Sequence, residues 1–185
     1  PLYYLYLKPF THFSDIVLRL TSVVPSLLAI VVMYLVGKEY SKKLGLICAT
    51  ITSVLSFLIY YAQEVRFYSL LFLFSALALL ATIKLIKNTS KKNVIFYCIS
   101  MILILLTHVL GGIFVLFNTL YVFYKKKCFS KKILLYVLSC AVFLLPFGLN
   151  ILKMLPSSQW WGHFSYTNIL FLFSDYLSPI LTNNI

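Results

Sequence analysis

Charged residues, and acidic ones above all, are scarce in this sequence. Only four of the 185 residues are aspartate or glutamate, and charged residues of both signs make up 11% of the chain, against about a quarter in an ordinary soluble domain. Hydrophobic residues make up 62%, and the mean hydropathy is +0.96. The composition excludes an ordinary soluble domain and predicts a polytopic membrane protein, because the uncharged runs are long enough for several spans of about 20 residues each.

Cysteines are few as well, and their spacing argues against a metal site. They lack the paired spacing of metal ligands, and three of the four lie inside apolar runs, where cysteine packs as a small hydrophobic residue. The sequence also lacks strand-like alternation and internal repeats. We therefore predict an all-α fold, a polytopic bundle of transmembrane helices. The cysteines are Cys48, Cys98, Cys128 and Cys140.

The remaining charges divide the chain into apolar runs, of which residues 94–124 form the longest. As one helix these 31 residues would measure about 46 Å, too long for one upright crossing of a hydrocarbon core of about 30 Å. Divided at THVLGG (107–112), where Gly111 and Gly112 supply backbone freedom, the run becomes a hairpin of two short helices. We expect about six membrane-crossing helices, at 16–36, 44–61, 67–83, the two halves of 94–124, and 133–152.

Basic residues set the expected orientation. Twelve of the sixteen lysines and arginines lie in three short segments between the predicted spans, at 38–43, 84–92 and 125–132. Such clusters are typical of cytoplasmic loops, whereas a nucleic-acid interface would spread them over one face among aromatic residues. Both ends of 94–124 are then cytoplasmic. This favours the hairpin over the alternative, a single strongly tilted span that would leave one lysine cluster outside.

The same topology gathers polar residues on the extracytoplasmic face. Gln63, Glu64 and Arg66 stand together at the outer turn between the second and third spans, and His108 lies at the outer turn of the hairpin. Each of these residues is also explained as a solvated turn residue or an interfacial residue. For Glu64 and Arg66 this alternative is supported by their spacing, because positions i and i+2 do not face each other on a continuous helix. Arg19 lies near the start of a span, where a cation must reach the interface or bind an anion. Further residues on or near this face are His12, Asp15, His163 and Asp175.

One segment resembles a known family. The stretch YYAQEVRFYSLL (60–71) is similar to the Tyr-Tyr-(Ser/Ala)-Gln-Glu-x-Arg-x-Tyr-(Ser/Ala)-Leu pattern of membrane glycosyltransferases of the family 39 type. PLYYLYL at the start, RLTSVVPSLL (19–28) and Thr-His before glycine are similar to other parts of that family. The resemblance extends from Pro1 to about Asn118. It implies the GT-C fold, which is shared with protein O-mannosyltransferases and lipid A aminoarabinose transferases.

The resemblance implies transfer of a sugar from a polyprenyl-phosphate donor to a glycan, lipid or protein acceptor, on the outer face of the plasma membrane. Arg66 would bind the donor phosphate. Glu64 is the catalytic candidate, which would orient the acceptor or sugar or help to hold a divalent metal ion. Further substrate-binding candidates are Gln63, Tyr61, Tyr68, His108 and Arg19.

The same resemblance limits what this chain can do alone. The family's principal catalytic carboxylate precedes the Pro-Leu-Tyr-Tyr motif, and Asp15 follows that motif and does not replace it. The sequence also begins in the middle of a motif and without methionine. We therefore expect residues 1–185 to be an internal piece of one transmembrane domain, without its first helix, first external loop and C-terminal part, and inactive by itself.

Two other classes of protein remain open. A lipid or polysaccharide transporter or flippase would carry polar groups and broken helices near the bilayer midplane. Here the strong polar cluster lies at one end, and the midspan residues are Leu, Ile, Val, Phe and Ala. A purely structural membrane subunit would show no clustering of charges on one face. An acidic residue in a short external loop upstream of residue 1 would favour the enzyme.

Overall fold

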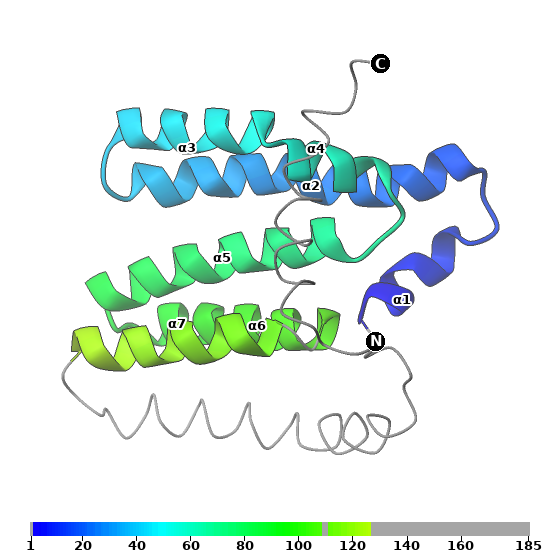
Figure 1. Ribbon diagram of the computed structural model, residues 1–185. Helices are drawn as coiled ribbons and strands as arrows, with labels where there is room; N and C mark the ends of the chain where they lie inside the picture. The colour runs from blue at the N-terminus through cyan, green and yellow to red at the C-terminus, as the bar shows by residue number, and fades with distance from the viewer. Residues whose placement is uncertain (1, 109–110, 127–185) are drawn as a thin grey trace, which may run out of the picture. The chain divides into compact units, whose positions relative to one another are not determined.

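A computed structural model describes residues 2–108 and 111–126, all of which belong to the first of two units into which the chain divides, Pro1–Val142. In these described residues the fold is entirely helical (Figure 1), so the predicted fold class is confirmed at that level. The last predicted span, 133–152, lies outside the described residues, as do His163 and Asp175. The helices are α1 (Leu2–Leu7), α2 (Asp15–Lys38), α3 (Lys42–Val54), α4 (Ser56–Gln63), α5 (Tyr68–Lys87), α6 (Lys91–Thr107) and α7 (Gly111–Lys126), with a 3-10 turn at Lys8–Phe10.

Helices α2 and α5 are each long and apolar enough to cross a membrane. Helix α2 has 24 residues and α5 has 20, which at 1.5 Å per residue gives about 36 Å and about 30 Å. Asp15 in the first turn of α2 and Lys38 in its last turn complement the helix dipole, and Lys84 and Lys87 do the same at the end of α5. These helices correspond to the first and third spans predicted from the sequence.

The second predicted span is broken. Helices α3 and α4 meet at Leu55, whose backbone is extended (φ −69°, ψ 112°), and their axes differ by 55°. Thr52 and Ser53 bond through their hydroxyls to the backbone carbonyls of Cys48 and Thr50, a competition for carbonyls that bends helices. The described residues therefore hold two candidate spans, or three if the bent pair crosses as one.

The long uncharged run forms two helices, as predicted, which end and begin on either side of His108. Helix α6 ends at Thr107, His108 is extended, and its carbonyl accepts a hydrogen bond from Gly111 N at 3.0 Å. Tyr97 Oη and Thr119 Oγ1 join α6 to α7 at 3.0 Å. With 17 and 16 residues, the two helices span only about 25 Å each, so their crossing of a full bilayer stays a prediction.

The reason for glycine at this hairpin differs from the one expected. Gly111 and Gly112 lie in the first turn of α7, and neither adopts a positive φ. A Cβ atom at Gly111 would lie 2.4 Å from Ile104 Cγ2, whereas one at Gly112 would lie 3.5 Å from its nearest neighbour, a Leu105 methyl. Gly111 is therefore explained by the close approach of α7 to the end of α6, and not by backbone freedom.

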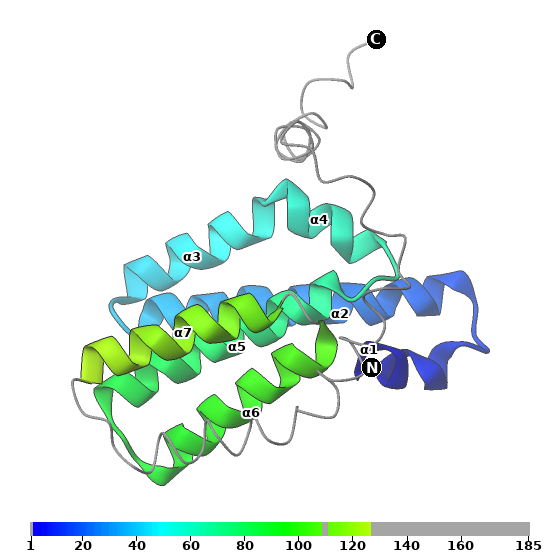
Figure 2. The ribbon, with the colours of Figure 1, turned by 60° about the horizontal axis from the view of Figure 1, so that its bottom comes forward.

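Helix α5 lies in the middle of the bundle, with α2 on one side and α6 and α7 on the other (Figures 1 and 2). Its small residues Ala76, Ala78 and Ala81 are almost completely buried and let neighbouring helices approach closely, as is usual in membrane helix packing. The largest side chains buried against it include Tyr97 and Ile104 of α6.

The helix ends separate into two groups. The lysine end is formed by the α2–α3 connection, the α5–α6 connection and the end of α7; the polar-turn end is formed by the α4–α5 turn and the break between α6 and α7 (Figure 1). At the lysine end, Lys87 binds Glu39 with Nζ–Oε2 2.9 Å. The lysine-bearing connections in the described part thus lie together, as the orientation argument requires, while the side of the membrane stays a prediction.

Candidate functional site

The polar triplet Gln63, Glu64 and Arg66 occupies the turn between α4 and α5. Helix α4 ends at Gln63, Glu64 is extended (φ −98°, ψ 143°), and the Arg66 N–H donates to the Glu64 carbonyl at 2.9 Å. This tight turn brings the two side chains face to face, with Arg66 Nε 3.0 Å from Glu64 Oε2. Side chains at positions i and i+2 point apart on a helix, but the chain is not helical at Glu64.

The ion pair is open to solvent on the arginine side. The Arg66 side chain is 59% exposed and that of Glu64 is 29% exposed. The Arg66 guanidinium is therefore accessible from solvent, whereas the Glu64 Oε2 atom that it contacts is buried.

His108 lies next to this turn, although it is 42 residues further along the chain from Arg66. Its imidazole stacks on the ring of Phe67, with centroids 4.2 Å apart and planes at 11°. Burial lowers the pKa of His108 below its ordinary value. The neutral ring that results at neutral pH has one nitrogen that donates a hydrogen bond and one that accepts.

Aromatic rings continue from this stack to both sides. Tyr61 and Tyr68 are in ring contact, with centroids 4.2 Å apart, and Phe67 contacts Tyr68 at the same distance. Ser69 donates a hydrogen bond to the Tyr61 carbonyl at 2.9 Å, which fastens the start of α5 to α4. Tyr61, Tyr68 and His108, three of the residues selected from the sequence, thus lie on one aromatic surface beside the ion pair.

Sequence reasoning missed the residues that hold this surface together. Phe67 contacts Tyr3 of α1 edge-on, with centroids 6.4 Å apart, and burial raises the pKa of Tyr3 to about 12. Phe67 and Ser69 lie within the quoted motif and Tyr3 within PLYYLYL, so the signal was present in the pattern. Their structural roles depend on contacts between α1, the start of α5 and the end of α6, which the sequence pattern does not reveal.

Among the described residues, two candidates are not joined to the group by polar side-chain contacts. Gln63 and Arg19 are both exposed, and in the described part of the chain no hydrogen bond or ion pair joins either one to Glu64, Arg66 or His108. Arg19 lies in the second turn of α2. His12 and Asp15 are exposed near the start of that helix.

The described residues do not supply a metal site. Within 2–108 and 111–126 no group of three or more His, Cys, Asp or Glu side chains is placed to hold a metal ion. Glu64 would be a single carboxylate ligand, and its Oε2 already pairs with Arg66. We therefore derive no chemical step from a divalent ion.

Comparison with known proteins adds no identification. No protein-family model, no curated protein and no solved structure matches this chain significantly.

Proposed function

We propose that this chain belongs to a GT-C-type membrane glycosyltransferase of the family 39 type, which transfers a sugar from a polyprenyl-phosphate donor to an envelope glycan, lipid or protein. The reaction takes place at the extracytoplasmic side of the plasma membrane. The observation that carries the proposal is the Glu64–Arg66 pair in a non-helical turn, with His108 beside it, at the end opposite the lysines.

Arg66 suits the phosphate of the donor. Departure of the sugar leaves negative charge on the polyprenyl phosphate, and a fixed cation at that position lowers the barrier because it binds the transition state better than the ground state. A guanidinium group offers two parallel N–H donors to phosphate oxygens. The exposure of Arg66 leaves room for this contact.

Glu64 and His108 suit the sugar or the acceptor. When the donor phosphate binds Arg66, the Glu64 carboxylate is released to accept a hydrogen bond from a hydroxyl group. A neutral His108 can both donate to and accept from sugar hydroxyls, and the rings of Tyr61 and Tyr68 provide an apolar surface for a sugar face or a prenyl chain. The resemblance assigns the main catalytic carboxylate to a segment before the Pro-Leu-Tyr-Tyr motif, so Glu64 is a supporting group in this scheme.

A transporter or flippase is the second candidate, and the break at Leu55 favours it. Transporters bind their substrates at interrupted helices, where unwound backbone exposes polar groups. The α3–α4 break has that form, but the residues at it are Leu55, Val54 and Ser56, and no charged side chain lies between Lys43 and Glu64. The polar groups are concentrated at the turn instead, which is why we prefer the enzyme.

Sugar transfer by the natural full-length protein in reconstituted membranes tests the proposal. With a panel of polyprenyl-phosphate sugars, we expect one donor to be consumed, and Arg66→Ala to lower kcat/KM by about 100-fold, the typical cost of losing one charge-stabilising donor. The kcat/KM of Arg66→Lys should lie between those of the wild type and Arg66→Ala, because lysine keeps the charge but lacks the planar guanidinium group. Glu64→Gln should lower kcat while donor binding stays intact.

Lys42→Ala is the matched control, since it removes an exposed cation at the lysine end. It should leave transfer unchanged. Wild-type transfer by Arg66→Ala and Glu64→Gln at equal protein abundance would contradict the site. Donor-independent movement of lipid or glycan across the bilayer, without sugar transfer, would favour the transporter.

A further inference from the structure

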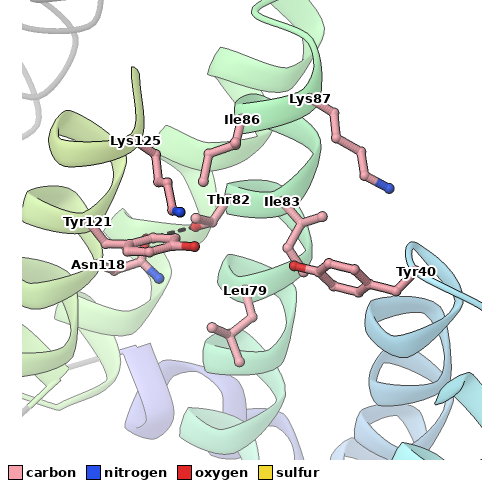
Figure 3. A pocket seen from close by; sticks show the side chains of 9 residues that line it. All are labelled: Tyr40, Leu79, Thr82, Ile83, Ile86, Lys87, Asn118, Tyr121 and Lys125. Carbon is pink, nitrogen blue, oxygen red and sulfur yellow. Dashed lines mark hydrogen bonds between the residues drawn. The ribbon is translucent and has the colours of Figure 1, made fainter. Parts of the chain in front are cut away.

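A second candidate site lies at the lysine end of the bundle, whereas Glu64, Arg66 and His108 lie at the polar-turn end. It is a cavity of about 460 Å³ between α5, α7 and the residues that follow α2. This volume lies within the range of pockets for small molecules, about 300–1,000 Å³. One wall is apolar and belongs to α5; it consists of Leu79, Ile83 and Ile86 (Figure 3).

Buried polar groups line the cavity where α5 faces α7. Asn118 of α7 is 9% exposed and Thr82 of α5 is 3% exposed. The Thr82 hydroxyl lies 2.7 Å from Asn118 Oδ1 and 2.7 Å from the Ala78 carbonyl, and its single proton is available to one of them at a time. When the proton bonds Asn118 Oδ1, the amide nitrogen of Asn118 points away from Thr82 and is left to donate (Figure 3). A buried amide group must form hydrogen bonds to offset its desolvation, so the free side of Asn118 is suited to an acceptor in the cavity.

Two lysines stand at the edge of this cavity, and their charges are not equally compensated. Lys87 Nζ is bound by Glu39, at 2.9 Å from Oε2 and also by the backbone carbonyl of the same residue. Lys125 Nζ lies 5.9 Å from the ring centroid of Tyr121, and no described residue forms an ion pair with it. Figure 3 shows its ammonium group directed toward Thr82. The site therefore keeps a net positive charge.

We propose that this cavity binds the phosphate head of an anionic phospholipid from the leaflet that surrounds the lysine end. Lys125 pairs with the phosphate, Asn118 donates a hydrogen bond to it, and the α5 wall receives the glycerol and the first part of an acyl chain. Basic pockets between membrane helices recognise lipid headgroups in this way. Free phosphate offers the same anion but would leave Leu79, Ile83 and Ile86 uncovered, which favours the lipid as its source. This site is independent of the proposed sugar transfer.

Lipid retention by the purified full-length protein tests this proposal. In detergent, with phosphatidylglycerol or phosphatidylcholine added at equal concentration, native mass spectrometry should show preferential retention of phosphatidylglycerol. Lys125→Gln should lower that retention by about fivefold, the equivalent of the roughly 1 kcal/mol that one lysine contributes near anionic headgroups. Inorganic phosphate in excess should not displace the lipid.

Lys92→Gln provides the matched control, because Lys92 is an exposed lysine in the first turn of α6, at the same end and outside the cavity. It should retain phosphatidylglycerol like the wild type. Equal losses in Lys125→Gln and Lys92→Gln would overturn the site, since retention would then follow net charge alone. Equal retention of the two lipids, or displacement by inorganic phosphate, would also overturn the lipid assignment.

Discussion

The two ends of this bundle each carry one ion pair in the described residues, and the two pairs differ in which parts of the chain they join. Glu39 and Lys87 are 48 residues apart, and their contact ties the end of α2 to the end of α5. Glu64 and Arg66 are neighbours within one turn, so their contact joins no two distant elements. The first pair supports the packing of the helices, whereas the second can be broken by a ligand without separating them.

The contacts of the aromatic residues also differ between the two ends. At the lysine end, Lys38, Lys87 and Lys125 each lie over a tyrosine ring, 5.6–5.9 Å from its centroid. Tyrosine and lysine together are typical of membrane–water interfaces. At the polar-turn end the rings contact one another at tilted angles, and Phe67 stacks on His108. That end therefore presents a partly buried aromatic surface instead of ammonium groups over separate rings.

Cysteine labelling should give the largest effect, because the result is all or none. Single cysteines are introduced at Gln63, at the polar-turn end, and at Lys42 and Thr89, at the lysine end; all three residues are exposed. In a background without native cysteines, an impermeant thiol reagent added to intact cells should modify Gln63→Cys alone. Lys42→Cys and Thr89→Cys should react only after the membrane is permeabilised. Opposite sides for Lys42 and Thr89 would contradict the gathering of the lysines.

Glycine replacements should have the next largest effect, and they compare helix contacts at the two ends. A Cβ at Gly37 would lie 2.7 Å from Gly45 Cα, and one at Gly111 would lie 2.4 Å from a side-chain methyl of Ile104. Backbone atoms yield less than a methyl group, so Gly37→Ala should lower the free energy of unfolding more than Gly111→Ala. Both losses should fall near the 1–3 kcal/mol that is typical of overpacking.

Gly112→Ala is the control for this comparison, because its Cβ would meet only an ordinary contact at 3.5 Å. It should leave stability unchanged or raise it slightly, since alanine favours a helix more than glycine does. Thermal unfolding in detergent measures all three. Equal stability of Gly111→Ala and Gly112→Ala would show that α6 and α7 are not in close contact at this point.

The pH dependence of stability should give the smallest effect. The pKa of His108 is lowered by burial, so between that value and about 6.5, the ordinary pKa of histidine, the unfolded state binds more protons. The contribution of His108 is therefore constant above a pH of about 6.5 and is lost as the pH falls through the lowered value. His108→Phe keeps an aromatic ring against Phe67 but removes the titrating group, so its free energy of unfolding should decrease less as the pH is lowered. An unchanged dependence would show that the imidazole is solvated.

The hairpin and the polar turn were predictable because their causes are local. A run of 31 uncharged residues is too long for one upright crossing, and polar residues inside an apolar sequence mark the end of a helix. The break at Leu55 was not predictable in this way, since neither glycine nor proline lies near it. Thr52 and Ser53 bond through their hydroxyls to carbonyls of the preceding turn beside the break, but Thr82 and Ser100 do the same within the unbroken helices α5 and α6, so these bonds alone do not explain it.

The composition of the candidate site needed contacts that the sequence does not contain. Glu64 and Arg66 were selected from the pattern, but their ion pair follows from the extended backbone at Glu64. The stacking of His108 on Phe67 follows from the antiparallel packing of α5 and α6, which places the start of one helix beside the end of the other. Gly111 was correctly placed at the hairpin, while the close approach to Ile104 that explains it appears only in the structure.

The contact between Gly37 and Gly45 also bears on how the chain is assembled during synthesis. Only residues 39–41 separate α2 from α3, and Ser41 caps the second helix by accepting a hydrogen bond from Leu44 N at 3.0 Å. Contacts between elements so near in sequence close at little entropic cost. We therefore expect α2 and α3 to pair as soon as both have left the ribosome, and to enter the bilayer as one unit against which α5 packs later.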